Sequence, residues 1–292
     1  MTNKELAEKI TSRLIEEMDK GVIPWDRPWT GSGDGAVSHT TGKAYSLINQ
    51  ILIAIAGHEN GGEYLTFNQV KAEGGKVKKG AHGVQIVFWK QYVKTEINED
   101  GEEVQHSIPV LKSYTVFSVK DCEGIKEKYA ARELKKNNPI EEAEKIVDAY
   151  TARETVTINR EKLSNRAFYS PMMDSITVPE INQFDAVEEF YSTLFHEMTH
   201  STGHSSRLNR FGASGSVAAF GSEEYSREEL IAEIGAACLV NTCGIETAKT
   251  FRNSAAYLQG WGAALRADPM LFITAASRAE KAVDYIVNGA KA

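Results

Sequence analysis

One segment constrains the fold of this 292-residue chain most, "DAVEEFYSTLFHEMTHST" at residues 185–202. Its apolar positions recur every three or four residues, which predicts an amphipathic helix with one buried face. His196 and His200 are four residues apart, so on this helix both imidazoles project from one face and can reach one metal ion. Residues 196–200 read H-E-x-x-H, the pattern of a zinc site whose glutamate acts as general base.

Glu197 is offset by one residue, which puts its carboxylate beside the ion, where it can take a proton from zinc-bound water. Zinc lowers the pKa of that water to about 7. The same pattern also arises by chance in helices, so the alternative is two surface histidines next to an unrelated charge. A third protein ligand would decide between these interpretations.

His204 is a poor candidate for the third ligand. On a straight helix it would lie about 12 Å along the axis from His196. It also misses the H-E-x-x-H-x-x-G-x-x-H pattern, because it directly follows Gly203. We therefore expect His204 to lie at the end of the helix or in the loop that follows it.

A second predicted helix, "SREELIAEIGAACLVNTCG" at 226–244, offers better candidates. Glu229 and Glu233 share one face, so one can bind the metal while the other hydrogen-bonds the far nitrogen of a ligating histidine. Glu229 is the preferred ligand, Glu233 the supporting residue, and Glu228, about 100° round the helix, the weaker choice. Small Ala232 would let the two helices approach closely. A solvated acidic face is the alternative.

Composition sets broader limits. The chain is 42% hydrophobic and 25% charged, as in ordinary soluble globular proteins. It lacks an apolar run of the ~20 residues needed to span a bilayer, and we expect no secretory signal, because residues 1–6 show no basic segment followed by an apolar core. Cys122, Cys238 and Cys243 form no C-x-x-C pair, which argues against disulfides and a cysteine-bound zinc. These features favour a cytoplasmic, reducing compartment.

The element pattern predicts an α+β fold in two parts. An N-terminal domain of mixed helices and strands spans 1–125, a linker and the start of the second domain span 126–150, and the second domain spans 151–292. Helices are expected at 3–20, 46–56, 253–266 and 270–288, besides the two above. Strands are expected at 155–159 and 175–179, and as a hairpin at 84–93 and 110–119.

A basic window stands out in the N-terminal part, although the net charge is −7. Six lysines between residues 71 and 94 accompany one acid, Glu73, and the aromatic residues Phe88, Trp89 and Tyr92. Single-strand-binding proteins combine basic grooves with aromatic rings on which bases stack. Strand alternation sends Phe88 and Lys90 to one face and Trp89 to the other. Aromatics in the core beside solvated lysines are the alternative. The candidate DNA-binding residues are Lys71, Lys76, Lys78, Lys79, Trp89, Lys90 and Lys94.

Two hydrolase classes are unsupported. "GASGS" at 212–216 misses the nucleophile pattern G-x-S-x-G, and the chain holds no G-x-x-x-x-G-K-[ST] phosphate loop.

Several longer segments carry a resemblance to a known family. They include "TTGKAYSLIN", "YLTFNQVKAEGGKVKKGAHGVQIVFW", "AFYSPMMDSITVP", "FYSTLFHEMTHSTGHSSRLNR" and "YSREELIAEIGAACL". Over nearly its whole length the chain resembles the antirestriction protein ArdC and its relatives on conjugative elements. The resemblance implies an N-terminal domain that binds single-stranded DNA and a C-terminal zincin-like metallopeptidase domain of the gluzincin type. It also implies His196, His200 and Glu229 as ligands and Glu197 as catalytic base.

Two further expectations concern the cleft. Residues 167–179 are expected to form a strand at its lip, to which a peptide can add as an extra strand. Tyr169 would then stand near the metal and stabilise an oxyanion, with a packed aromatic as the alternative. The loop at 211–222 is either a lid or an ordinary surface loop.

The leading hypothesis is therefore a cytoplasmic zinc-dependent endopeptidase domain joined to a sequence-nonspecific single-stranded-DNA binder that protects incoming DNA from host restriction. Manganese or another divalent ion is the alternative to zinc. A second hypothesis is protection by DNA occupancy alone, with a structural or vestigial metal site. A third is a regulatory protease that cleaves a repressor and does not bind DNA.

Overall fold

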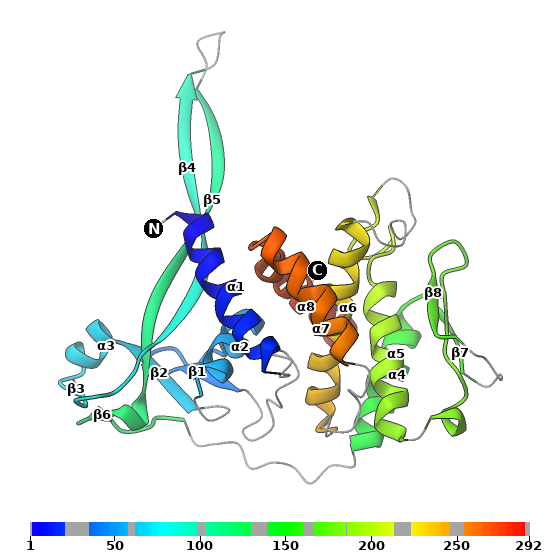
Figure 1. The fold of residues 1–292 in the computed structure, drawn as a ribbon, viewed down its shortest axis with the longest axis horizontal. Helices are drawn as coiled ribbons and strands as arrows, with labels where there is room; N and C mark the ends of the chain where they lie inside the picture. Colours follow the sequence, from blue (N-terminus) through cyan, green and yellow to red (C-terminus); the bar gives the residue numbers. More distant parts are fainter. Residues whose placement is uncertain are drawn as a thin grey trace.

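The computed structural model describes residues 2–20, 35–57, 62–97, 103–129, 139–160, 166–184, 186–212, 223–245 and 254–289. Within these ranges the predicted α+β architecture is confirmed, with most helices gathered in the C-terminal half (Figure 1). None of the helices in the described ranges is long and apolar enough to cross a membrane.

The N-terminal half is built on a four-stranded sheet with the strand order β1-β2-β5-β4. Its strands are β1 (Ala36–Ser38), β2 (Gly62–Thr66), β4 (Val84–Ile97) and β5 (Glu103–Ser118). β1 runs parallel to β2, and the other pairs are antiparallel. A smaller pair, β3 (Lys76–Val77) and β6 (Cys122–Glu123), lies beside α3 (Phe67–Ala72).

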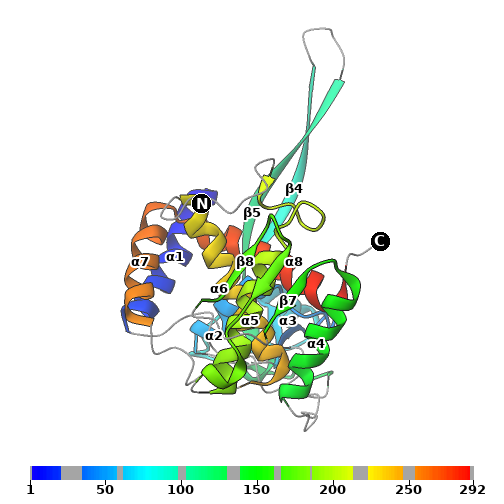
Figure 2. The same cartoon turned by 90° about the vertical axis from the view of Figure 1, so that its right-hand side faces the viewer.

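The β4–β5 hairpin is longer than predicted. Its pairing continues from Val84↔Val116 to Ile97↔Glu103, whereas the sequence predicted strands that end at Val93 and begin at Val110. The outer part reads "KTEI" and "EVQHS", which lacks the apolar alternation of a strand that covers a core. In both Figure 1 and Figure 2 the hairpin projects well beyond the helices.

Two helices flank this sheet. α1 (Asn3–Asp19) starts at a capping box between Thr2 and Glu5 and buries a stripe that includes Leu6, Ile10 and Leu14. α2 (Leu47–Ile55) sits against the edge strand β4, where the Asn49 amide pairs with both the backbone nitrogen and the carbonyl oxygen of Val87, each at 2.8 Å. These bonds satisfy backbone groups at the outer edge of β4, which no other strand of the described residues pairs.

A buried ionic cluster holds the end of this half in place. His39 is fully buried between Glu63 and Glu73. The other oxygen of Glu63 accepts hydrogen bonds from the backbone nitrogens of Lys128 and Tyr129 at 2.8 and 2.6 Å. The start of the predicted linker is therefore fixed to the N-terminal sheet.

The C-terminal half combines five helices, in the described ranges, with a small sheet. The helices are α4 (Pro139–Arg153), α5 (Val187–Ser201), α6 (Glu223–Cys243), α7 (Ser254–Ala267) and α8 (Leu271–Asn288). The sheet has the order β7-β9-β8, with β7 (Thr157–Asn159), β9 (Ser175–Thr177) and β8 (Phe168–Ser170). β8 is an edge strand, and it lies against α5.

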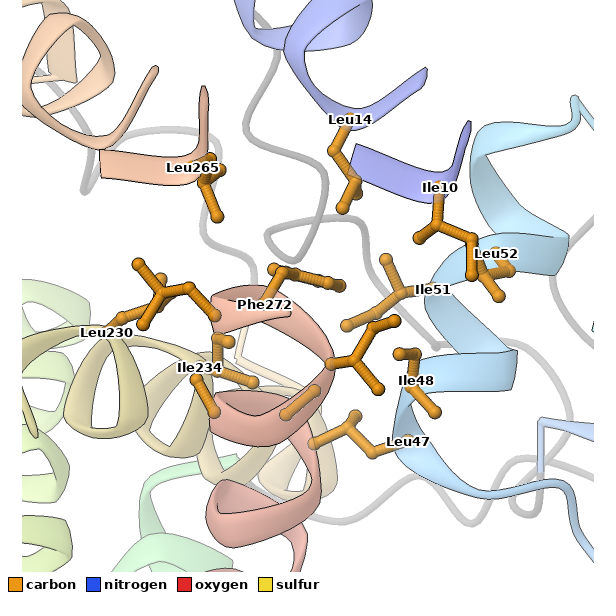
Figure 3. Packing of buried hydrophobic residues seen from close by; sticks show 14 of the residues in the cluster. Ile10, Leu14, Leu47, Ile48, Ile51, Leu52, Leu230, Ile234, Leu265 and Phe272 are labelled. Atoms are coloured by element: carbon orange, nitrogen blue, oxygen red, sulfur yellow. The ribbon is translucent and has the colours of Figure 1, made fainter. Parts of the chain in front are cut away.

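One hydrophobic core joins the two halves of the chain. Leu14 of α1 and Ile51 of α2 belong to the same buried cluster as Ile234 of α6, Leu265 of α7 and Phe272 of α8. Figure 3 shows these side chains converging from all five helices around Phe272. Residues from both sides of the predicted 126–150 segment thus form one shared hydrophobic core.

A second core supports the C-terminal sheet. Phe190, Leu194, Phe195 and Met198 form the buried face of α5 and pack with residues of α4, α6, α8 and the sheet. The predicted helix at 185–202 therefore buries the face that its periodicity indicated, and it directs His196 and His200 toward α6.

Candidate metal centre

Three ligand-type side chains converge between α5 and α6. Nε2 of His196 lies 3.1 Å from Nε2 of His200. The two oxygens of Glu229 lie 3.5 Å from these two nitrogens, Oε2 from His196 and Oε1 from His200. Each of the three residues offers one ligand atom, and these atoms lie within 4.8 Å of one another. The donor set fits a divalent cation, because two imidazoles and one carboxylate are the protein ligands of gluzincin-type sites.

The crossing of α5 and α6 sets this geometry. Gly235 of α6 faces Thr199 of α5 so closely that a Cβ at Gly235 would lie 2.6 Å from Cγ2 of Thr199. The sequence had suggested Ala232 for the close approach, and Ala232 is indeed fully buried. The contact that brings the helix backbones together, however, is made at Gly235.

Each histidine also has a carboxylate at its other ring nitrogen. Oε1 of Glu233 lies 3.6 Å from Nδ1 of His196, at the place where the sequence predicted a supporting residue. Oε1 of Glu228 lies 3.3 Å from Nδ1 of His200. The 100° offset that made Glu228 a weak choice as ligand is what carries it to the far side of His200. Carboxylates in this position fix the tautomer and the orientation of a ligating imidazole.

Arg210 completes this support, and sequence reasoning missed it. Its guanidinium donates to both oxygens of Glu228, from Nε at 3.0 Å and from Nη2 at 2.6 Å. It also donates to Oγ1 of Thr202 at 2.6 Å and to the carbonyl oxygen of Thr199 at 2.8 Å. No periodic signal marks Arg210, since it lies in the turn after α5 and reaches α6 only through the tertiary fold.

The electrostatics of the site favour a cation. Burial of Glu229 raises its pKa, but the hydrogen bond with His196 and the nearby histidine charges outweigh burial and lower the pKa overall. Burial likewise disfavours the charged form of His196, yet the hydrogen bond with Glu229 and the charges of Glu233 and Glu197 raise its pKa to about 9. Four carboxylates (Glu197, Glu228, Glu229 and Glu233) surround two imidazoles and one guanidinium, which leaves an excess of negative charge for an ion to neutralise.

Glu197, the predicted base, is buried, and its charge acts on His196. His204 is placed elsewhere. α5 ends at Ser201, and Nδ1 of His204 lies 2.8 Å from the hydroxyl of Ser206 in the following turn. It is not among the converging ligand-type residues.

Tyr169 is engaged away from the ligand-type residues. Its hydroxyl donates to Oδ1 of Asp174 at 2.8 Å and accepts from Nη2 of Arg207 at 3.2 Å. Its ring lies in the second core and stacks on Phe211 with ring centroids 6.3 Å apart. These contacts favour the packed aromatic over the oxyanion stabiliser. Most of the predicted lid, residues 213–222, lies outside the described residues.

The lysines of the basic window (residues 71–94) lie in two separate parts of the N-terminal half. Lys71, Lys76, Lys78 and Lys79 lie on or near α3 and β3, where Nζ of Lys78 donates to the carbonyl of Lys120 at 2.7 Å. Lys90 lies on β4. The side chain of Lys94 lies outside the described residues.

The hairpin carries an exposed aromatic face that the sequence revealed only in part. The register pairs Phe88 with Lys112 and Ile86 with Tyr114, so these residues share a face with Lys90 and Tyr92. Phe88, Tyr92 and Tyr114 are 41–48% exposed. The ammonium groups of Lys90 and Lys112 lie 5.2 and 5.7 Å from the centroid of Tyr92. We call Phe88, Lys90, Tyr92, Lys112 and Tyr114 the aromatic–basic face.

Trp89, the aromatic residue that the sequence singled out, lies on the opposite face from Tyr92 and is 42% exposed. The alternative that these aromatic residues belong to the core is not favoured, because Phe88, Trp89 and Tyr92 are each more than 40% exposed on both faces of the hairpin. Lys112 and Tyr114 could not be found without knowing the strand register.

Comparisons with known proteins agree with both halves of the fold. A family model described as the N-terminal domain of anti-restriction factor ArdC matches residues 4–117. A second, described as zincin-like metallopeptidase, matches residues 141–278. The crystal structure of the antirestriction ArdC protein from plasmid R388, in metal-free form, is 34% identical, with a TM-score of 0.71 over 96% of each chain. The Mn(II)-bound structure of that protein is 33% identical, with the same TM-score and coverage.

Similar sequences also occur in other proteins. The chain is 34% identical over 301 residues to a DNA primase TraC of Escherichia coli, which covers 97% of this chain and 27% of the primase. It therefore spans about a quarter of that relative's length. It is 28% identical to the uncharacterised protein y4eC of Sinorhizobium fredii, over 98% of this chain and 92% of that protein.

Proposed function

The chain belongs to the family of the antirestriction protein ArdC, and on that premise we propose that it binds single-stranded DNA through its N-terminal half and hydrolyses peptide bonds at the α5–α6 site. The observation that carries the enzymatic part is the convergence of His196, His200 and Glu229 beside Glu197. Zinc is the proposed ion, with manganese as the alternative, since a relative's crystal structure contains Mn(II).

The residues of this site have separable roles in the proposed reaction. His196, His200 and Glu229 would hold the ion, which supplies a Lewis acid that activates water and polarises a carbonyl. The Glu197 carboxylate accepts the proton of the attacking water and returns it to the leaving amide nitrogen. Glu228 and Glu233 hold the imidazoles in the orientation that binding requires.

The edge strand β8 offers a place for an extended peptide. It lies against α5, which bears the histidines, and its outer edge is free to pair within the described sheet. The adjoining turn exposes Met172 and Met173 at 91% and 72%. Flexible methionines suit apolar side chains of varied shape, so the proposed substrate is an extended, partly apolar segment.

Metal analysis tests the site directly. We expect about one divalent ion per chain in the wild-type protein and its loss in His196→Ala and Glu229→Ala. The matched control is His204→Ala, which should retain the ion. Metal retained in both His196→Ala and Glu229→Ala would refute the proposed ligand set.

The DNA-binding part rests on the aromatic–basic face. Stacking of a base on an exposed ring contributes ~1–3 kcal/mol, and lysines neutralise phosphates. We expect Tyr92→Ala with Lys112→Ala to weaken binding of single-stranded oligonucleotides about tenfold or more and to reduce its salt dependence. Lys145→Ala, on the exposed surface of α4, is the control.

A second candidate function, protection by DNA occupancy alone, is favoured by the location of this face on a hairpin that projects from the protein (Figure 2). Glu197→Gln separates the two. A peptidase mechanism predicts that this variant retains the ion but no longer hydrolyses a protein substrate or protects DNA from restriction. Full protection by Glu197→Gln would establish occupancy instead.

The third candidate, a protease that cleaves a repressor, requires no affinity for DNA. Absence of salt-sensitive oligonucleotide binding by the wild-type protein would favour it. We place the activity in the bacterial cytoplasm, a location supported by three free thiols in a chain without disulfides among its described residues.

A further inference from the structure

Two neighbouring parts of the aromatic–basic face differ in what surrounds their rings. Phe88 and Tyr114 form an edge-to-face pair, with ring centroids 5.8 Å apart and ring planes at 69°. Tyr92 lies further along β4 and instead has the ammonium groups of Lys90 and Lys112 beside its ring. The face therefore contains a purely aromatic part and a cationic part.

The Phe88–Tyr114 pair is anchored in the sheet. The ring of Phe88 also lies against Tyr45, with centroids 6.5 Å apart, and Tyr45 packs edge-to-face on Tyr64 at 6.4 Å. Tyr64 is 2% exposed and belongs to a buried cluster of this half. Phe88 and Tyr114 nevertheless remain 41% and 48% exposed. Rings that are held from behind and open in front are preorganised for stacking on a base.

Stacking on this pair requires an unpaired base. Inside a duplex the faces of each base are covered by the neighbouring base pairs, so a protein ring reaches them only if the duplex is unstacked, which costs free energy at every opened step. Phosphates are exposed in single strands and duplexes alike, and contacts with them do not distinguish the two. A preference for single strands must therefore come from the aromatic part of the face.

The cationic part suits phosphates. Cation–π attraction holds both ammonium groups near the ring of Tyr92, which limits the rotamer freedom that long lysine side chains lose on binding. The strand segments 84–93 and 110–118 contain no aspartate or glutamate, so no acid of these segments neutralises the two lysines. Lys112 pairs directly with Phe88 in the register, which places a positive charge beside the aromatic pair.

We propose that Phe88 and Tyr114 determine the preference for single-stranded DNA by stacking on an unpaired base, while Lys90 and Lys112, held by Tyr92, bind the adjacent phosphates of single strands and duplexes alike. This inference rests on the proposed single-stranded-DNA binding and assigns its selectivity to two residues. Without these two rings the face becomes a general polyanion-binding surface.

Fluorescence anisotropy with a labelled single-stranded oligonucleotide and with its duplex of equal length tests this division. We expect the wild-type protein to bind the single strand about tenfold more tightly, as one stacked base allows. Phe88→Leu combined with Tyr114→Leu should make the two affinities nearly equal and leave their salt dependence unchanged. Phe88→Tyr retains a ring and should preserve the preference. The matched control is Trp89→Leu, an equally exposed aromatic position on the opposite face, which should also preserve it.

Lys90→Gln combined with Lys112→Gln should give the complementary result. Both affinities should fall together, and the slope of log affinity against log salt should decrease by about one to two, while the preference for the single strand remains. Tyr92→Leu should likewise weaken both affinities without altering the preference.

Three results would overturn the inference and leave DNA binding intact. They are equal binding of single strand and duplex by the wild-type protein, a preference unchanged in the Phe88→Leu, Tyr114→Leu variant, and a preference reduced as strongly by Tyr92→Leu. Failure of the wild-type protein to bind either oligonucleotide would overturn both proposals.

Discussion

Oε1 of Glu228 lies 3.3 Å from Nδ1 of His200, and the same carboxylate accepts two hydrogen bonds from Arg210. The turn after α5 therefore orients a histidine of α5 through a residue of α6. Burial alone would raise the pKa of Glu228, but the hydrogen bonds from His200 and Arg210 lower it and keep the carboxylate charged.

The first prediction concerns this chain of contacts. Arg210→Lys removes the two-pronged hydrogen bond to Glu228 while it retains the positive charge. We expect the affinity for the divalent ion to fall about 10- to 100-fold, as for other residues that orient a ligand. Competition with a chromophoric chelator measures the change. Arg278→Lys is the control, and an unchanged affinity in Arg210→Lys would deny Arg210 a positioning role.

The second prediction concerns the helix crossing. Gly235→Ala places a methyl group 2.6 Å from Cγ2 of Thr199, so α5 and α6 must separate. We expect a loss of stability of ~1–3 kcal/mol from overpacking, together with weaker metal binding, because the ligands come from both helices. Thr199→Ala in the same chain should restore much of both losses. Chemical denaturation and metal titration of the double-mutant cycle test this, and strict additivity would argue against the contact.

The third prediction concerns pH. Asp174 accepts hydrogen bonds from Arg207, Tyr169 and Thr155, and these outweigh burial and lower its pKa from the ordinary value of 3.8. Since the folded pKa is depressed, the carboxylate stabilises the protein fully above the unfolded pKa, and this stabilisation is lost as the pH falls through the folded value.

Asp174→Asn should therefore destabilise the protein at pH 7 by ~3–5 kcal/mol, the cost of breaking a buried pair, since the side chain of Arg207 is fully buried. The difference from wild type should shrink below about pH 4. Asparagine tolerates the positive φ of 43° at this position, so backbone strain is not added. Asp148→Asn, on the exposed side of α4, is the control, and an equal difference at pH 7 and pH 3 would contradict the assignment.

The fourth prediction concerns the shared core. Phe272 is fully buried where α1, α2, α6, α7 and α8 meet (Figure 3). Phe272→Ala should lower the free energy of unfolding by ~3–5 kcal/mol. Because the core joins both halves, oligonucleotide binding and metal binding should be lost in one transition during denaturation. Phe168→Ala, at a 46% exposed position, is the control, and two separate transitions would show that the halves unfold independently.

The sequence by itself predicted most of the helices and the three ligand-type residues that the structure brings together at the candidate metal centre. Periodicity indicated the buried face of α5, and the spacing of His196 and His200 put both imidazoles on one side of it, because these are properties of a single helix. Periodicity likewise put Glu229 and Glu233 on one face of α6, and the family resemblance indicated Glu229 as the ligand. Local repeats of 3.6 residues are enough to decide which residues share a helix face.

Tertiary structure alone decided which groups meet across elements. Arg210 reaches Glu228, Lys112 joins Tyr92, and Glu280 caps α2 from the opposite end of the chain, and each contact depends on how separate elements pack. The hairpin likewise leaves both rows of aromatic residues exposed because it extends beyond the core, not because of its alternation. Contacts between distant residues arise when whole helices and strands pack together. The residue pattern within one element does not specify which other element packs against it.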